Sequence, residues 1–314
     1  MRAVRATALI VGMLLAAGAL GLAQRARIDA TALVDDLRQL SADAMEGRRV
    51  GTAGGARARA LLVDRFRAAG LRPFAGTFEQ PFRGATGVAG VNVVGYVPGR
   101  VRPDRYLVIG AHYDHLGIRD GRVFNGANDN ASGAAALAVL AAYFVQHRPA
   151  TSLVFAAFDG EEAGLVGSRA FVARPPVPRA AILIALNMDM IGRDPANTLW
   201  VVGTHQQPAL VPLVDQAAAR ASVVLRRGYD NPADGRSRDW TRDSDHWAFL
   251  EAGLPALYFG VEDFALHHDP DDDFDRMTLD FYVRAVESMV DVVEVMDAGA
   301  GTLERLTPAR PRAR

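Results

Sequence analysis

The sequence predicts a single α/β domain whose strands lie buried between two layers of helices. From residue 91 onward, short apolar runs of four to eight residues alternate with segments of helical spacing. The runs are rich in Val, Ile, Leu and aromatic residues and are apolar on both alternating faces, which is typical of strands covered on both sides. No internal repeat and no linker rich in Pro, Gly or Ser divides the chain, so we expect one domain over residues 24–298.

The first 23 residues have the pattern of an export signal. Arg2 and Arg5 precede a continuous apolar stretch from Ala6 to Leu20, and the small residues that follow suit a cleavage site. The apolar stretch is shorter than the ~20 residues that a membrane helix needs, so an uncleaved anchor is the weaker alternative. We expect the mature protein to be periplasmic or secreted and free of the membrane.

Helices and strands follow the signal in order. Helical spacing predicts helices over residues 28–40 and 56–69, the second ended by Gly70. The apolar runs predict six buried strands, over residues 91–96, 106–111, 152–158, 181–188, 199–203 and 255–260. Further helices are expected over residues 131–147, 208–221 and 280–296. The tail over residues 299–314 is expected to be disordered.

The composition excludes several kinds of function. The chain of 314 residues carries 35 basic and 36 acidic residues, so we expect no basic surface for nucleic acid. It contains no cysteine, which excludes thiol nucleophiles, disulfides and cysteine-ligated metals. All 35 basic residues are arginine, and the absence of lysine excludes Schiff-base chemistry and a Walker-type phosphate loop. Catalysis therefore depends on the remaining polar side chains or on a bound metal.

Acidic and histidine side chains follow three of the predicted strands at the points where the strands end. His112 follows the second run, Glu161–Glu162 follows the third, and Asp189 follows the fourth. Asp129 lies at a helix start, and His268 lies in a late loop. Ligands of open α/β sheets bind beyond the carboxyl ends of the strands, where so many carboxylates need a cation. Imidazole and carboxylate without thiolate suit zinc, manganese or cobalt, and two ions that share a carboxylate can activate a bridging water.

Each of these residues also has a purely structural interpretation. His112 alone could be a core histidine, but Asp114 shares its side of the extended segment and can hold its ring. Asp129 could be the N-cap of the helix that follows, and Glu161–Glu162 could be a solvated pair at a helix N-terminus. Asp189 is harder to explain in this way, because a lone buried carboxylate needs compensation.

The chain resembles the M28 zinc aminopeptidases over nearly its whole exported length. The resemblance rests on a series of motifs in the family's order: EGRRVGTAGG, GAHYDHLG, GANDNASG, FDGEEAGLVGS, NMDMIGR, SDHWAFLEAGLPALYF and HHDPDDDFDRM. It implies a three-layer α/β/α sandwich around a mixed, mostly parallel sheet, two zinc ions, peptide substrates and hydrolysis of the N-terminal peptide bond by a metal-activated water. A monomer is the expected oligomeric state.

Carried over residue by residue, the resemblance implies five ligands, with His112 and Asp189 on one zinc, Glu162 and His268 on the other, and Asp129 shared by both. Glu161 would be the general base, and Asp114 would orient His112. The acidic run over residues 269–273, which follows His268, is expected to be a solvated loop, with calcium binding as a minor alternative.

The sequence departs from the family at two substrate contacts. His267 stands where relatives often have a tyrosine that helps to stabilise the oxyanion, so the donor remains open between His267, His246 and a metal. Some relatives have an arginine that contacts the peptide immediately before the SDH motif. Here that position is Asp243, which leaves Arg242, one residue earlier, as a possible contact.

Other functions remain as alternatives. A glutaminyl cyclase would use one zinc, and a carboxypeptidase would need a basic pocket from Arg193, Arg238 or Arg242. A catalytically inactive metal-binding or receptor-like domain should have lost a ligand or the base, whereas all are present. A serine hydrolase is the weakest alternative, because the chain has no GxSxG motif.

Overall fold

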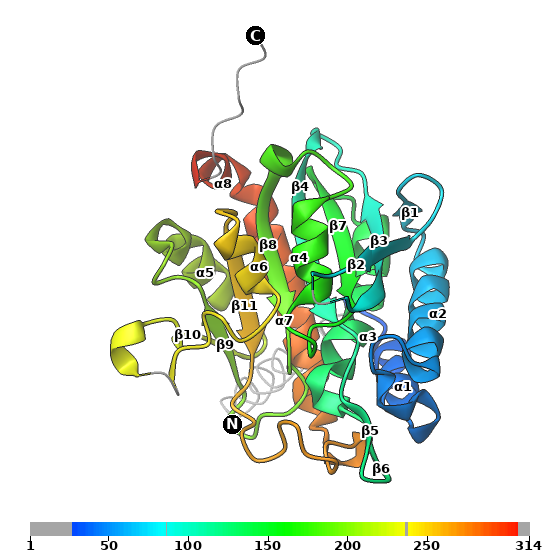
Figure 1. Cartoon of the computed structure of the whole chain (residues 1–314). Helices are drawn as coiled ribbons and strands as arrows, with labels where there is room; N and C mark the ends of the chain where they lie inside the picture. The colour runs from blue at the N-terminus through cyan, green and yellow to red at the C-terminus, as the bar shows by residue number, and fades with distance from the viewer. Residues whose placement is uncertain (1–26, 86, 236–237, 307–314) are drawn as a thin grey trace, which may run out of the picture.

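A nine-stranded sheet forms the centre of the computed structural model, which describes residues 27–85, 87–235 and 238–306 (Figure 1). The predicted signal peptide over residues 1–23 lies outside the described residues. The strand order is β1-β3-β7-β4-β8-β11-β9-β10, and β2 pairs with β3. The strands of this sheet are β1 (Arg72–Pro73), β2 (Glu79–Arg83), β3 (Ala89–Val97), β4 (Arg102–His112), β7 (Thr151–Phe158), β8 (Ile182–Met188), β9 (Thr198–Val202), β10 (Val224–Arg227) and β11 (Ala256–Gly260).

The sheet is mixed, with a parallel centre. The neighbours β7, β4, β8 and β11 are parallel, whereas β3 pairs antiparallel with β7, and β9 pairs antiparallel with β11. All six predicted strands are present, and every residue of β7 is buried. The prediction omits β1, β2, β10 and the separate hairpin of β5 (Gly117–Arg119) and β6 (Arg122–Phe124), because these strands are short and largely polar.

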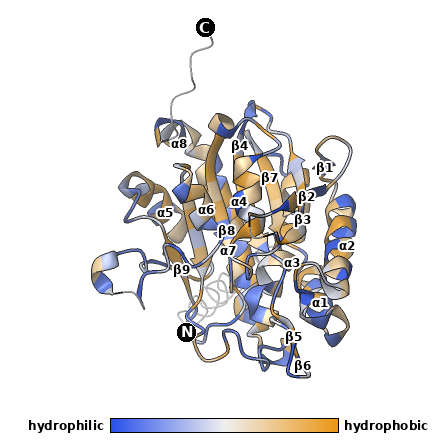
Figure 2. Cartoon of the chain, in the orientation of Figure 1, coloured by the Kyte–Doolittle hydropathy of each residue, from blue (hydrophilic) through white to orange (hydrophobic). Residues whose placement is uncertain are grey.

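Helices cover both faces of the sheet, as the sequence predicts. The helices are α1 (Ala30–Leu40), α2 (Ala53–Ala68), α3 (Gly133–Gln146), α4 (Val166–Ala173), α5 (Val211–Ala218), α6 (His246–Glu251), α7 (Leu279–Ala298) and α8 (Ala300–Leu306). One hydrophobic core joins α1, α2, α3, α5 and α7 to one face, and a second joins α4 and α6 to the other. Figure 2 shows the central strands as the most hydrophobic part of the ribbon. None of the helices among the described residues is long and apolar enough to span a membrane.

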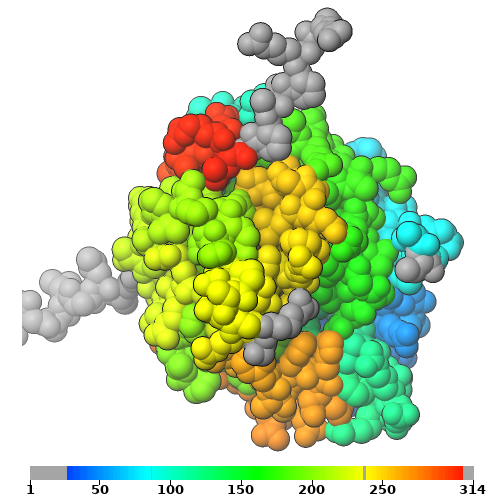
Figure 3. All heavy atoms as spheres, turned by 60° about the vertical axis from the view of Figure 1, so that its left-hand side comes forward, coloured from blue at the N-terminus to red at the C-terminus, as the bar shows by residue number. Residues whose placement is uncertain are grey.

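The prediction of a disordered tail over residues 299–314 is wrong for its first part. Residues 300–306 form α8, whose Ala300 and Leu303 are fully buried in the core that also contains α7. Figure 3 shows this helix in red against the body of the molecule. Leu306 of the same helix is partly buried and packs against this core as well. Residues 307–314 lie outside the described residues.

Candidate metal centre

The predicted site residues meet at the carboxyl edge of the central parallel strands. β4 ends at His112, β7 leads into a turn that carries Glu161–Glu162, and β8 leads into Asp189. These side chains line a cavity of about 500 Å³, together with Asp129 and His268. Residues that are up to 156 positions apart in the chain, from 112 to 268, are thus brought to one cavity.

The first group of donor atoms surrounds the ring of His112. Its Nε2 atom lies 3.2 Å from Oδ1 of Asp189 and 3.4 Å from Oδ1 of Asp129. All three side chains are buried. The other ring nitrogen, Nδ1, contacts the main-chain oxygen of Asp114 at 3.1 Å, which fixes the orientation of the ring.

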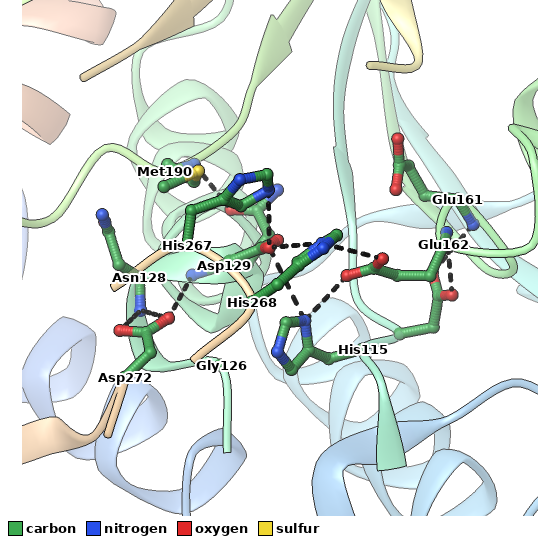
Figure 4. A network of polar contacts seen from close by, with 12 residues as sticks. His115, Gly126, Asn128, Asp129, Glu161, Glu162, Met190, His267, His268 and Asp272 are labelled. Atoms are coloured by element: carbon green, nitrogen blue, oxygen red, sulfur yellow. Dashed lines mark hydrogen bonds and ion pairs between the residues drawn. The ribbon is translucent and has the colours of Figure 1, made fainter. Parts of the chain in front are cut away.

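The second group of donor atoms surrounds the ring of His268. Its Nε2 atom lies 3.0 Å from Oε2 of Glu162 and 3.4 Å from Oδ2 of Asp129 (Figure 4). The two oxygens of Asp129 therefore face different groups, because Oδ1 is directed to His112 and Oδ2 to His268. A single carboxylate stands between two sets of ligands.

The spacing of these atoms suits zinc. Zinc–nitrogen and zinc–oxygen bonds of about 2.0–2.1 Å in a tetrahedral site place neighbouring donor atoms about 3.3 Å apart. The separations in the two groups run from 3.0 to 3.4 Å. The donors are imidazole nitrogens and carboxylate oxygens, which zinc accepts in hydrolytic sites. The residues present in the two groups therefore fit zinc.

Two further histidines lie against the same carboxylates. Nδ1 of His115 is 2.8 Å from Oε1 of Glu162 and 3.7 Å from Oδ2 of Asp129, and its ring is fully buried. Nε2 of His267 is 3.6 Å from Oδ2 of Asp129, and this side chain lines the cavity. His115 is not among the predicted site residues, although it is the second histidine of the GAHYDHLG motif and follows the same strand as His112.

Asp114 has a wider role than orienting His112. Its carboxylate lies 3.7 Å from Nδ1 of His112, so the closer contact to the ring is the main-chain oxygen. The carboxylate instead accepts hydrogen bonds from the main-chain N–H groups of Glu161, at 3.0 Å, and Glu162, at 3.4 Å. Asp114 thereby joins the end of β4 to the turn that carries both glutamates.

Asp129 lies in an irregular segment that precedes α3, and the alternative that it caps this helix is wrong. Its backbone is extended, with φ −104° and ψ 97°, and Ser132 is the residue at the N-cap. The main-chain N–H groups of Asn128 and Asp129 donate to the carboxylate of Asp272 at 3.0–3.1 Å. Asp272 is only 1% exposed, so the prediction of a solvated loop over residues 269–273 is wrong for this residue.

The electrostatics of the cluster favour a bound cation. Burial, together with the charges of Glu162 and Asp189, raises the pKa of Asp129 well above its usual value. Burial also raises the pKa of Glu161, to which the neighbouring carboxylates add. Although burial opposes it, the charges of Asp189 and Glu161 raise the pKa of His112. The cluster alone therefore retains protons, and a divalent cation would take their place.

The structure brings only one of the three possible substrate contacts to the cavity. His267 lines it, with 48% of its side chain exposed. His246 is fully buried, contacts the ring of Tyr258 and does not line the cavity, which contradicts its prediction as an oxyanion donor. The guanidinium of Arg242 stacks over Trp247, outside the cavity lining.

The family model described as "Peptidase family M28" matches residues 92–293, which is more than half of the chain. The chain belongs to peptidase family M28. The matched stretch of this M28 protein contains every residue in the two groups of donor atoms.

Two curated relatives illustrate the range of this family. A "Probable zinc metalloprotease" of Pyrenophora tritici-repentis is 30% identical over 217 residues, which cover 56% of this chain and 48% of the relative. A "Glutamate carboxypeptidase 2 homolog" of Caenorhabditis briggsae is 39% identical over 195 residues, covering 55% of this chain and 24% of the relative. The M28 protein thus spans about half the length, or less, of these curated relatives.

Solved structures share the fold. An aminopeptidase from Aneurinibacillus sp. strain AM-1 has a TM-score of 0.67 and 17% identity, with 85% of this chain and 93% of the other covered. The Bacteroides thetaiotaomicron glutaminyl cyclase bound to N-acetylhistamine has a TM-score of 0.68 and 18% identity, with coverages of 85% and 97%. At these identities the likeness establishes the α/β/α fold, which the two solved proteins use for different reactions.

Proposed function

We propose that this M28 protein is a two-zinc aminopeptidase that hydrolyses the N-terminal peptide bond of peptides. The observation that carries the proposal is the division of the Asp129 carboxylate, whose Oδ1 faces His112 and whose Oδ2 faces His268. A carboxylate shared in this way is typical of two-metal hydrolytic sites. Bound there, zinc would supply an activated water and would polarise the scissile carbonyl. Family membership and the "zinc metalloprotease" relatives support the same chemistry.

Glu161 is the acid–base residue in this proposal. Its side chain lines the cavity beside Glu162, and its main-chain N–H donates to Asp114, which fixes the turn. Burial raises the pKa of Glu161, and this helps the carboxylate to take up a proton during the reaction and return it to the leaving amine. Neighbouring Glu162 faces the two histidines instead, so the adjacent residues have separate tasks.

The charge of the cavity wall favours a substrate with a free amino group. Besides the proposed zinc ligands, Glu161, Asp243 and Asp263 line the cavity, whereas no arginine among the described residues lines it. A cationic α-amino group would be attracted to this wall and a C-terminal carboxylate would be repelled. Arg193, a candidate for a carboxylate pocket, pairs with Asp263 and Asp272. These contacts favour an aminopeptidase over a carboxypeptidase.

Zinc content and a matched pair of substrates test the proposal. We expect two equivalents of zinc per chain and release of aniline from leucine anilide, both lost after chelation and regained with zinc. The N-acetylated anilide serves as the control and should resist cleavage, because it lacks the amino group. Equal cleavage of both anilides would contradict the exopeptidase assignment. One equivalent of zinc with cyclisation of an N-terminal glutamine peptide would establish the cyclase instead.

A further inference from the structure

His115 is a buried histidine whose two ring nitrogens have unequal surroundings. Nδ1 lies 2.8 Å from Oε1 of Glu162, whereas Nε2 is buried without a hydrogen-bond partner in the described part of the chain. A neutral imidazole carries one N–H group, and its position follows the available acceptor. The proton therefore belongs on Nδ1, which donates to the Glu162 carboxylate.

The two oxygens of Glu162 are divided between two histidines. Oε1 accepts from His115, and Oε2 lies 3.0 Å from Nε2 of His268. In Figure 4, dashed lines join the Glu162 carboxylate to both rings, one oxygen to His115 and the other to His268. The main-chain N–H of Glu162 is held at 3.4 Å by Asp114, so both ends of this residue are tethered. Oε2 is then the oxygen that faces His268 within the second group of donor atoms.

The ring of His115 is confined where it lies. A Cβ atom placed on Gly126 would stand 2.5 Å from Cδ2 of the ring, so only glycine leaves room for it. Gly126 adopts a left-handed conformation, with φ +53°, and its carbonyl accepts a hydrogen bond of 2.9 Å from buried Arg48. The ring therefore packs against a fixed loop and cannot turn away from Glu162 without moving that loop.

We propose that His115 is a positioning residue that binds Oε1 of Glu162 and thereby presents Oε2 to the zinc ion shared with His268. The inference rests on the two-zinc site of the proposed function. Groups that orient a ligand in this way typically change metal affinity or activity by about 10- to 100-fold when they are removed. In His115→Phe, the ring shape is kept but the donor is lost, so the carboxylate should rotate more freely and the second zinc should bind more weakly.

A pair of amide variants tests the position of the donor. The amide nitrogen of asparagine takes the place of Nδ1, whereas that of glutamine extends to the place of Nε2. Zinc binding is measured by competition with a chelator on the full chain, with exposed His147, replaced by phenylalanine, as the control. We expect His115→Asn to bind two zinc ions much as the unchanged protein does, and His115→Gln and His115→Phe to lose affinity for one ion by about 10- to 100-fold.

The outcomes separate this proposal from the proposed function. If the unchanged protein binds two zinc ions and His115→Phe binds them equally well, the positioning role is refuted and the aminopeptidase stands. If asparagine impairs binding as much as glutamine and phenylalanine do, His115 acts as a direct ligand or by packing, and the proposal is also refuted. If the unchanged protein fails to bind two ions, the proposed function itself fails. Because asparagine and glutamine are both small polar amides, comparing them remains informative even if the phenylalanine variant misfolds.

Discussion

Replacing Arg48 with methionine should destabilise the metal-free protein by about 3 kcal/mol or more. The Arg48 side chain is fully buried beneath the loop that carries Asp129. Its N–H groups donate to five main-chain oxygens. Four of these lie at 2.9 Å or less, those of Leu40, Tyr113, Asn125 and Gly126, and the fifth, that of Asp129, lies at 3.5 Å. One side chain thus connects α1 to the loops that follow β4 and β6.

The expected magnitude follows from the carbonyl groups that the substitution leaves behind. Methionine fills much of the volume but donates no hydrogen bond, and a buried acceptor without a partner costs about 1–3 kcal/mol. The Gly126 carbonyl keeps its hydrogen bond from the main-chain N–H of Ala131, so three close carbonyls, those of Leu40, Tyr113 and Asn125, are left to lose a partner. Together they cost about 3–9 kcal/mol, of which the release of a buried cation offsets a part. Lysine at this position keeps the charge but has a single donor centre. The stability of Arg48→Lys should therefore lie between those of the unchanged protein and Arg48→Met.

Urea denaturation followed by circular dichroism measures the loss, with Arg57→Gln as the control. Arg57 is 44% exposed and donates to the carbonyl of Ala44, so its removal should cost less than about 1 kcal/mol. If Arg48→Met unfolds within about 1 kcal/mol of the unchanged protein, the carbonyls find other partners and the reasoning from hydrogen bonds is wrong.

Three further predictions concern catalysis, pH and the last helix. Glu161→Gln should keep both zinc ions and the unfolding curve but lower kcat by about 10²–10⁴-fold, and near-normal turnover would remove Glu161 from its role. Burial and then the charge of Asp114 raise the pKa of Asp159 to about 7. The metal-free fold should therefore lose stability as the pH rises from about 4 to about 7, because the carboxyl ionises at a lower pH in the unfolded chain than in the folded protein. This loss, up to about 4 kcal/mol in the free energy of unfolding measured with urea, should be absent in Asp159→Asn. If the pH dependence of unfolding is the same in the variant, Asp159 is not its cause. Leu303→Ala should cost about 2–4 kcal/mol, since the side chain is fully buried, and a thermal midpoint equal to that of the unchanged protein would mean that α8 adds no stability.

The centre of the fold is predictable from the sequence because its strands are apolar on both faces. β7 and β8 carry no solvent-facing residue, so their composition alone marks them as buried strands. Most residues of the edge strands β2 and β10 are exposed, so these strands resemble loops in sequence. Their pairing depends on β3 and β9, which local sequence does not reveal.

The site is predictable where a residue directly follows a buried strand. His112 and Asp189 stand at such positions, so their shared location follows from topology. Asp272 and His115 are different, because their importance depends on contacts across the fold, with the main chain of Asp129 and the carboxylate of Glu162. An acidic run and a second histidine in a motif are too common in sequence to indicate these partners.

The position of Arg48 has a consequence for where an autonomous unit can begin. The stretch by which the family is recognised starts at residue 92, whereas Arg48 and the buried leucines of α1 precede it. A shortened chain that began at residue 92 would leave the underside of the Asp129 loop open to water. The smallest fragment of this protein that can fold around the Asp129 loop therefore has to include residues well before position 92, where the match to the family begins.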